Sequence, residues 1–472
     1  PSVTYVGSDD GMLHAFYTKD VVINGTSYIG GNEVFAYMPK SMLKVVTKLY
    51  AQGGQVADPR QHIYGLASSP KVKSICTSNC TSDSAIWKTV LVMTEGWGGN
   101  GLFMLDVTNP AASQPFGLLW TSANDQQAST YNAELGYTAS VPAFTFLPST
   151  GMNDFRVIMG SGYPVTDGST TQGRYLIASS VQDGTIMTAN PITPANTCSI
   201  DYTLLTDVGT ARRQTKDSNG TAVGRKEFLS GYFGDTWGNL WMYTPTGGPQ
   251  VLSAFGCNHP LHFSPTVVQP DADDPNNPNA GDIYLVQVSN SSLDVDTENF
   301  PASQMVIMKQ KFGGTGDPTI DTSFGTNGKI TLTASNTSQM CGETNASGSS
   351  CLTPLPANAR PLATPTGILK GDGTGFYTFS NWYAPADAGC GKGASYLLIH
   401  ELAGSSVTLK QAVKIADEPV VNPIIVKGNL MVSTSTGPLS IAGSVVIKIV
   451  NATEPRSNLG DPFQMSGWTE IQ

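Results

Sequence analysis

The chain has 472 residues, of which only 13% are charged, and it is rich in glycine (50) and proline (30). Its formal net charge of -10 gives no electrostatic reason to bind phosphate backbones or anionic lipid, which argues against nucleic acid as a partner. No stretch approaches the roughly 18 apolar residues that span a bilayer. The composition is typical of a turn-rich β-protein. The sequence starts directly in an expected strand, without Met or a signal segment, so we interpret it as a fragment of a longer protein.

The first predicted element is a hairpin whose pattern occurs twice. The stretches YVGSDDGMLHAF at residues 5–16 and YFGDTWGNLWMY at residues 232–243 both read Tyr-x-Gly-x3-Gly-x-Leu-x2-aromatic. We expect the Tyr and the final aromatic residue to face a core. The two glycines should flank a tight turn that needs positive φ or close backbone packing, so a bulky residue at Gly11 or Gly238 should damage a hairpin. We interpret Asp9 and Asp10 as turn residues.

One short helix is predicted after this hairpin, in PKSMLKVVTKLYAQGG at residues 39–54. Met42, Val45, Val46 and Leu49 fall on one helical face, and Gly53 ends the run. Strand-turn-strand signals fill most of the remaining chain, bounded by Gly, Asn, Asp and Pro. They include KTVLVMTEGWGGNGLFMLDV, GDIYLVQVSNSS and ASYLLIHELAG.

These hairpins recur at a spacing that favours an all-β fold, a β-propeller built from small antiparallel sheets. A tandem of β-sandwiches is the alternative, but it predicts a boundary linker and self-contained sets of about seven strands. Since the composition does not shift along the chain, we expect one domain over residues 1–472. Residues 293–361 look like a decorated insertion that contains few strands.

The chain has seven cysteines, and two close pairs of them, in CTSNC and CGETNASGSSC, fall in loops rich in Ser, Thr and Asn. We predict that Cys76 pairs with Cys80 and that Cys341 pairs with Cys351, which implies an oxidising compartment. Cys198, Cys257 and Cys390 can form at most one further bridge among themselves, and the sequence leaves their pairing open.

A candidate calcium loop lies in PDADDPNNPNAGD, where oxygen-bearing residues stand at EF-hand-like offsets of 1, 3, 7, 9 and 12. Two prolines and a missing glycine at offset 6 favour the alternative, a solvated turn before the strand IYLVQV. The candidate ligands are Asp271, Asp273, Asn277, Asn279 and Asp282. A second set of residue types that can bind a metal is Cys257, His259 and His262. We expect no metal site there, because the two histidines should point to opposite faces of a strand.

Motifs for catalysis are missing. The chain has no Gly-x-Ser-x-Gly elbow, no His-Glu-x2-His pair and no phosphate-binding Gly-x4-Gly-Lys loop. We interpret its tryptophans, including Trp97, Trp237 and Trp241, as core or surface-belt residues. The chain is therefore predicted not to be an enzyme, and no quinone cofactor is expected.

Several stretches, taken in order, resemble the C-terminal propeller of the PilY1/PilC family of type IV pilus biogenesis proteins. They are YVGSDDGMLHAF with NEVFAYMPKSML, WKTVLVMTEGWGGNGLFMLDVTNP, LGYTASVPAF, RVIMGSGYP and EPVVNPIIVKGNLMVSTST. YFGDTWGNLWMY matches the family signature Gly-Asp-x2-Gly-Asn-x-Trp through Gly234, Asp235, Gly238, Asn239 and Trp241.

Departures from the family pattern occur at two places. YGLASSP at residues 64–70 lacks the aspartate of a common Val-Asp-Gly-Ser-Pro run. Some members carry a calcium loop where this chain has Asp217, Asn219 and Thr221, but Arg225 stands where a closing carboxylate is needed.

The resemblance implies a modified propeller of about seven blades and quinoprotein-like type, exported to the extracellular pilus tip. There it would bind minor pilins, support pilus assembly and retraction control, and attach to a host or abiotic surface without catalysing a reaction. The alternative is a secreted quinoprotein-like dehydrogenase.

Overall fold

A computed structural model describes most of the chain, in ordered segments separated by gaps. Backbone and side chains are described for residues 1–51, 62–77, 84, 86–122, 131, 133–147, 155–165, 171–194, 197–199, 202–213, 226–270, 281–289, 302–313, 316–333, 339–345, 348, 350–370, 375–385, 393–420, and the backbone alone for 78, 424–426, 429–434 and 437–440. Two compact units emerge. The expectation of one domain over residues 1–472 stays a prediction.

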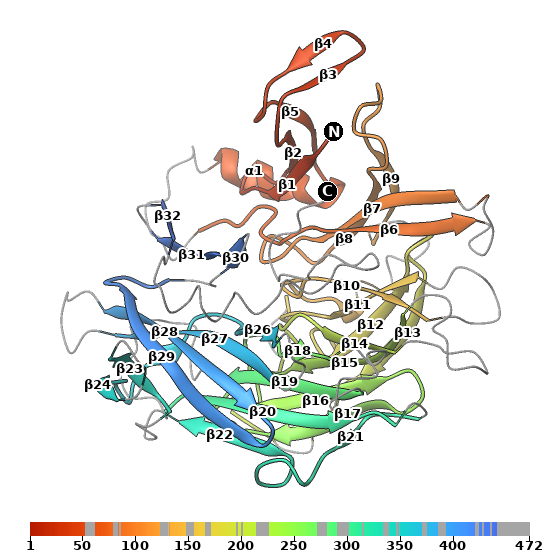
Figure 1. Cartoon of the computed structure of the whole chain (residues 1–472). Helices are drawn as coiled ribbons and strands as arrows, with labels where there is room; N and C mark the ends of the chain where they lie inside the picture. The colour runs from red at the N-terminus through yellow and green to blue at the C-terminus, as the bar shows by residue number, and fades with distance from the viewer. Residues whose placement is uncertain are drawn as a thin grey trace. The chain divides into compact units, whose positions relative to one another are not determined.

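Unit 1 holds the described residues within 1–193 and 201–208 and is built from antiparallel sheets (Figure 1). Each sheet is assembled mainly from strands that follow one another in the chain, which is the pattern of propeller blades. The sheets are β1 (Val3–Gly7), β2 (Leu13–Tyr17) and β5 (Glu33–Tyr37); β6 (Lys71–Ser78), β7 (Ile86–Thr94), β8 (Leu102–Asp106) and β9 (Gly117–Thr121); and β10 (Ala143–Phe146), β11 (Phe155–Gly160), β12 (Tyr175–Ser180) and β13 (Ile186–Pro191).

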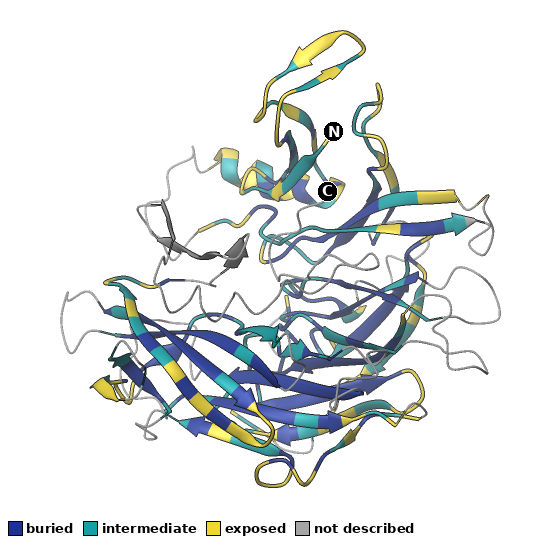
Figure 2. Cartoon of the chain, viewed as in Figure 1, coloured by how far each residue is buried: buried dark blue, intermediate teal, exposed yellow. Residues whose placement is uncertain are grey.

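Two small elements complete unit 1. The hairpin of β3 (Val21–Ile23) and β4 (Thr26–Tyr28) is largely exposed, as its yellow and teal colouring shows (Figure 2). The helix predicted near residues 39–54 is confirmed as a short η1 (Lys40–Met42) followed by α1 (Leu43–Ala51). Met42 and Val45 are buried on the face predicted from the periodicity, against strands β2, β5 and β7.

Unit 2 repeats the same architecture over the described residues within 194–200 and 209–460. Its middle strands, such as β16 and β19, are buried along their whole length because both faces are covered. The strands are β14 (Gly209–Arg213), β15 (Glu227–Gly234), β16 (Asn239–Thr244) and β17 (Gly248–Ala254); β18 (Thr266–Val268), β19 (Asp282–Ser289), β20 (Gln304–Lys311), β21 (Thr319–Ile320) and β22 (Lys329–Thr333); β23 (Cys341–Thr344) and β24 (Cys351–Pro354); β25 (Arg360–Pro361), β26 (Thr366–Leu369), β27 (Gly375–Ala384), β28 (Ala394–Ala403) and β29 (Ser406–Ala416); and β30 (Ile424–Val426), β31 (Asn429–Thr434) and β32 (Gly437–Ser440).

Residues 293–361 differ from the expected insertion with few strands. The range contains β20, which pairs with β19 along all eight of its residues and buries Met305–Met308 and Gln310. It also contains β22, which pairs with the other edge of β20. The loops around these strands are polar and rich in glycine, so the strands were not predicted from the sequence, although MVIM within β20 is an apolar run.

We predicted that the first Tyr and the final aromatic residue of each twelve-residue copy face a core. This prediction holds for the second copy but fails for the final aromatic residue of the first copy. Tyr232 and Tyr243 are both buried. In β2 the inward side chains are Leu13, Ala15 and Tyr17, so Phe16 lies on the opposite face and stacks on His14. Strand alternation in this half-exposed sheet therefore puts the next residue, Tyr17, in the core.

Candidate functional site

Three hairpin turns share one hydrogen-bond pattern, and two of them are the copies of the twelve-residue stretch. In each turn the amide of the first residue donates to the carbonyl that closes the turn. The pairs are Ser8 to Met12 (3.0 Å), Glu95 to Gly101 (3.0 Å) and Asp235 to Asn239 (3.1 Å). The third turn, at residues 95–101, is two residues longer than the others. Its sequence therefore does not match the twelve-residue pattern, although its hydrogen bonding is the same.

Each copy of the stretch also fixes a chain segment outside its own hairpin. The carbonyl of Ser8 accepts the amide of Leu66 (2.8 Å), and the carbonyl of Asp235 accepts the amide of Leu261 (3.0 Å). The first glycine lets that segment approach, since a Cβ would lie 2.3 Å from the Leu66 carbonyl at Gly7 and 2.5 Å from Leu261 Cβ at Gly234. The second glycine has positive φ, +86° at Gly11 and +77° at Gly238, which confirms the predicted turn.

Asp235 explains the polar part of the signature. Its carboxylate is fully buried and accepts hydrogen bonds from Trp241 Nε1 (2.7 Å), Asn239 Nδ2 (2.9 Å) and the Asn239 amide (2.9 Å). Burial raises the pKa of Asp235, and these hydrogen bonds oppose that rise. Aspartate, asparagine and tryptophan at this spacing therefore form one structural cluster that holds the turn.

Glu95 has the same role in unit 1. Its buried carboxylate accepts hydrogen bonds from Ser41 Oγ and from the Gly101 amide (3.0 Å), and burial raises its pKa. A Cβ at Gly99 would lie 2.0 Å from Glu95 Oε2. The glycines of this turn thus leave space for the Glu95 carboxylate. The side chain of Trp97, the large residue of the turn, is exposed.

A ladder of backbone contacts joins the turns of unit 1 to one another. Tyr137 and Tyr163 exchange amide–carbonyl hydrogen bonds of 2.5 and 3.0 Å, and the Gly162 amide donates to Leu204 (3.1 Å). Gly96 bridges to Ala67 on one side and to Thr138 on the other. We call the turns and segments that meet along this ladder the turn face of unit 1; its described residues are 8–12, 62–67, 95–101, 134–140, 161–165, 171–173 and 202–206.

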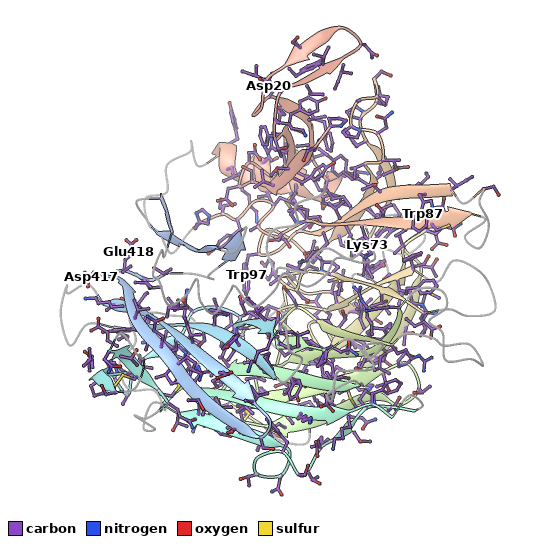
Figure 3. All side chains as sticks on the ribbon, in the orientation of Figure 1. Asp20, Lys73, Trp87, Trp97, Asp417 and Glu418 are labelled. Atoms are coloured by element: carbon purple, nitrogen blue, oxygen red, sulfur yellow. A yellow bond between two sulfur atoms is a disulfide. The ribbon has the colours of Figure 1, made fainter. Side chains whose placement is uncertain are left out.

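Three aromatic rings gather on the turn face. Trp97 lies with its ring centroid 6.2 Å from Tyr137 and 5.9 Å from Tyr163, tilted by 39° and 49°. Trp97, which is labelled in Figure 3, is 38% exposed. Tyr137 and Tyr163 are half-buried. Sequence analysis assigned Trp97 to a core or belt position and gave no sign that the tyrosines join it, because the three come from different turns.

The first hairpin carries a cluster of histidines and carboxylates on the same unit. His14 Nδ1 lies 2.6 Å from Glu33 Oε1 and its Nε2 lies 2.9 Å from Asp10 Oδ2. Asp9 pairs with His62 (3.2 Å). Asp9 and Asp10 also accept backbone amides from Gly65 and Met12, so they are turn residues as predicted and ion-pair partners in addition.

The stability of this hairpin should depend on pH through His14. The Glu33 hydrogen bond, with a smaller contribution from Asp10, raises the pKa of His14 above its usual 6.5. The stabilisation is therefore complete below pH 6.5 and is lost as the pH rises through the raised value. We expect the stability difference between the native chain and His14→Gln to be larger at pH 6 than at pH 9 in thermal unfolding. Glu33→Gln should remove most of this pH dependence, and equal differences at both pH values would contradict it.

The candidate calcium loop falls almost wholly outside the described residues. Asp271, Asp273, Asn277 and Asn279 lie there, as does the degenerate loop of Asp217, Asn219, Thr221 and Arg225. Asp282 is described: it is buried, pairs with Lys309 Nζ (2.8 Å) and accepts a hydrogen bond from Tyr284 (3.3 Å). A calcium ion that used Asp282 would have to displace this lysine. Within the described ranges no group of three or more His, Cys, Asp or Glu side chains could hold a metal ion.

Calorimetric titration with calcium tests the predicted loop directly. If the loop binds calcium, the purified chain should give a heat of binding that Asp271→Ala abolishes, because a carboxylate ligand is lost. Asp317→Ala, which changes an aspartate outside the loop, serves as the control. The absence of binding heat, or a heat unchanged by Asp271→Ala, removes the site.

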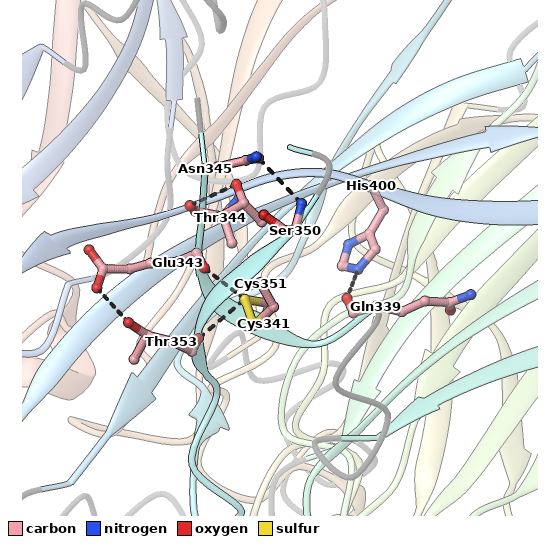
Figure 4. Close-up of a disulfide and its surroundings, with 10 residues drawn as sticks. Gln339, Cys341, Glu343, Thr344, Asn345, Ser350, Cys351, Thr353 and His400 are labelled. Atoms are coloured by element: carbon pink, nitrogen blue, oxygen red, sulfur yellow. Dashed lines mark hydrogen bonds between the residues drawn. A yellow bond between two sulfur atoms is a disulfide. The ribbon is translucent and has the colours of Figure 1, made fainter. Parts of the chain in front are cut away.

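The disulfides confirm one predicted pair and settle one that the sequence left open. Cys341 is bonded to Cys351, beside the Glu343–Thr353 hydrogen bond (Figure 4). Cys198 is bonded to Cys257, which takes this sulfur out of any metal triad with His259 and His262. Burial lowers the pKa of His262 to about 4, as befits a neutral core histidine. Cys76 is disulfide-bonded as well, and both Cys80 and Cys390 lie outside the described residues.

In the part of the chain that the structure describes, the helices are too short or too polar to cross a membrane.

Comparison with known proteins gives a consistent result. Residues 1–248, just over half of the chain, match the family model of the PilY1 beta-propeller domain. The type IV pilus biogenesis factor PilY1 of Pseudomonas aeruginosa strain UCBPP-PA14 is 31% identical over 246 residues, which cover 52% of this chain and 17% of that protein. A PilY1 homolog of Xylella fastidiosa is 32% identical over 167 residues, or 35% of this chain and 9% of that protein. The chain thus spans a small part of these relatives.

Among solved structures, the crystal structure of the Pseudomonas aeruginosa PilY1 C-terminal domain matches with a TM-score of 0.52. The match covers 93% of this chain and 92% of that domain at 16% sequence identity, so it shows a shared fold. The expected propeller architecture is confirmed by this likeness and by the family match, whereas the number of blades stays a prediction. The chain belongs to the PilY1 beta-propeller domain family.

Proposed function

We propose that this propeller acts in type IV pilus biogenesis as a non-enzymatic component of the pilus tip. The observation that carries the proposal is the match of residues 1–248 to the PilY1 propeller family, whose curated members are named type IV pilus biogenesis factors. In this role the chain binds minor pilins, supports pilus assembly and retraction control, and contributes to attachment to a host or abiotic surface. Its disulfides suit the oxidising, extracellular environment that this location requires.

The buried carboxylates of the turns also favour a scaffold over an enzyme. Glu95 and Asp235 are buried and accept hydrogen bonds from neighbouring protein groups, so neither carboxylate is available to a substrate. These two carboxylates therefore support the structure of the turns, and exposed side chains on the turns are left for binding.

Co-purification with the soluble domains of minor pilins from the same organism tests the proposal. We expect the immobilised chain to retain one or more minor pilins in stoichiometric amount, with the major pilin as the control for non-specific capture. No retention of any minor pilin contradicts the proposal. A bound quinone absorbance or dehydrogenase turnover in the purified chain would favour the alternative, a quinoprotein-like enzyme.

A further inference from the structure

The outer face of the helical segment formed by η1 and α1 carries a row of three lysines. Lys40, Lys44 and Lys48 are spaced four residues apart, and all three are exposed. Four residues advance a helix by about 6 Å and slightly more than one turn, so the three side chains lie along one side. The segment contains no aspartate or glutamate, and no salt bridge joins any of these lysines to another described residue. The row is therefore a compact positive surface on a chain whose net charge is -10.

Two exposed apolar side chains lie beside the lysine row. Leu43 is 55% exposed and Tyr50 is 88% exposed. They are seven residues apart, which is about two turns, so they share one side of α1. Met42 and Val45, on the opposite side, are buried in the core of unit 1. The helix thus uses one side for the core and presents an apolar strip next to a basic strip on the other.

The helical segment is fixed on unit 1 by polar and apolar contacts. Ser41 Oγ donates a hydrogen bond to the buried carboxylate of Glu95. The neighbouring turn packs so closely that a Cβ at Gly11 would lie 3.3 Å from Val46 Cγ2. Lys44 acts on Glu95 and opposes the rise in pKa that burial causes, but the Lys44 side chain itself is exposed. A partner would therefore meet a surface that is already ordered.

The charges around the helix favour a discrete acidic patch over a broad anionic surface. The turn at residues 8–12, which packs against α1, carries the exposed carboxylates of Asp9 and Asp10. An anionic bilayer would meet these carboxylates as well as the lysines, and it would repel a chain of net charge -10. The row also contains no arginine, whose guanidinium binds phosphate through two hydrogen bonds. Protein carboxylates, placed individually opposite the lysines, are the better match.

We propose that the outer face of η1 and α1 is a docking surface for an acidic protein. Carboxylates of that protein pair with Lys40, Lys44 and Lys48, and an apolar side chain beside them covers Leu43 and Tyr50. The inference rests on the proposed function, because the acidic protein is one of the minor pilins that the propeller binds.

The test measures binding of the purified chain to the soluble domains of minor pilins from the same organism, at low and at high salt. We expect at least one of them to bind, with an affinity that falls as salt screens the charges. The triple variant Lys40→Glu/Lys44→Glu/Lys48→Glu should bind at least about tenfold more weakly, because three attractive charge pairs become repulsive. The triple arginine variant at the same positions keeps the charges, so its affinity should stay within about threefold of the native value.

Matched variants separate a local effect from a change in net charge or in folding. Lys48→Glu and Lys19→Glu both reverse the charge of an exposed lysine in unit 1, but only Lys48→Glu should weaken binding. Tyr50→Ala should weaken binding about fivefold, because the apolar contact is lost. Since Tyr50 is 88% exposed, its thermal unfolding midpoint should equal that of the native chain. The same midpoint in the triple glutamate variant excludes a folding defect.

The results that overturn the inference differ from those that overturn the proposed function. If the triple glutamate variant binds minor pilins as tightly as the native chain, only the inference fails. If the native chain binds no minor pilin, the proposed function and the inference fail together. If the triple glutamate variant keeps its pilins but loses binding to phosphatidylserine vesicles, the lysine row is a lipid site. If it keeps its pilins but loses a dimer that the native chain forms, the row binds a second copy of the chain.

Discussion

Replacing both Cys198 and Cys257 by serine should lower the free energy of unfolding by about 4 kcal/mol. The bond joins residues 59 apart in sequence, and closing a loop of that length removes about this much conformational free energy from the unfolded chain. It is the longer of the two described disulfide loops. Because native domains are stable by only about 5–15 kcal/mol, the loss should be visible as a large shift in the midpoint of guanidinium unfolding.

The second disulfide provides the matched control for this effect. The Cys341–Cys351 bond spans only 10 residues, so its double serine variant should lose about 3 kcal/mol, less than the first. In the presence of a reductant that opens the bonds, the native chain should unfold like the Cys198→Ser/Cys257→Ser variant or earlier. An unchanged midpoint in the oxidised variant would show that this bond does not hold unit 2 together.

Gly238→Ala should destabilise the chain by at least about 3 kcal/mol, which is large for a single methyl group. The glycine has a φ of +77°, where an L-residue is disfavoured by about 1–2 kcal/mol. In addition, a Cβ would lie 2.3 Å from the Gly256 carbonyl oxygen and 2.8 Å from that of His259, and neither backbone atom can rotate away. Trp237 and Trp241 flank this turn, so tryptophan fluorescence reports its unfolding directly.

Gly248→Ala is the control that separates the two causes of destabilisation in Gly238→Ala, which are the clash of the added Cβ and the positive φ of the backbone. Gly248 has a similar φ of +69° in the same sheet, but no atom lies within 4 Å of its Cβ position. We expect this variant to lose only about 1 kcal/mol. Equal midpoints for the two variants would mean that the backbone around Gly238 relaxes and that the glycine is not needed for close approach.

Turns, the short helix and the hairpin disulfide can be predicted from the sequence, because the residues that determine each of them lie within about a dozen positions. Gly11 and Gly238 have the positive φ that the spacing indicated, and the helix after Pro39 buries the predicted face. Cys341 and Cys351 pair because a hairpin connects them. In these cases turn chemistry and periodicity carry the information.

Features that depend on residues far apart in the chain could not be predicted in this way. The Cys198–Cys257 bond and the His14–Glu33 contact depend on which segments the sheets bring together. The cluster of Trp97, Tyr137 and Tyr163 needs three turns to meet on one backbone ladder. Strand β20 was not predicted, because the polar loops on both sides of its eight residues dominate the composition of this range.

The most direct measurement is a count of assembled surface type IV pili in the organism that encodes this chain, after in-frame deletion of the codons for residues 1–472. We expect the pili to be lost or sharply reduced, and to return when the deleted segment is restored in its native context. Cells that keep their full number of pili, with normal retraction and surface attachment, would contradict a role in pilus biogenesis.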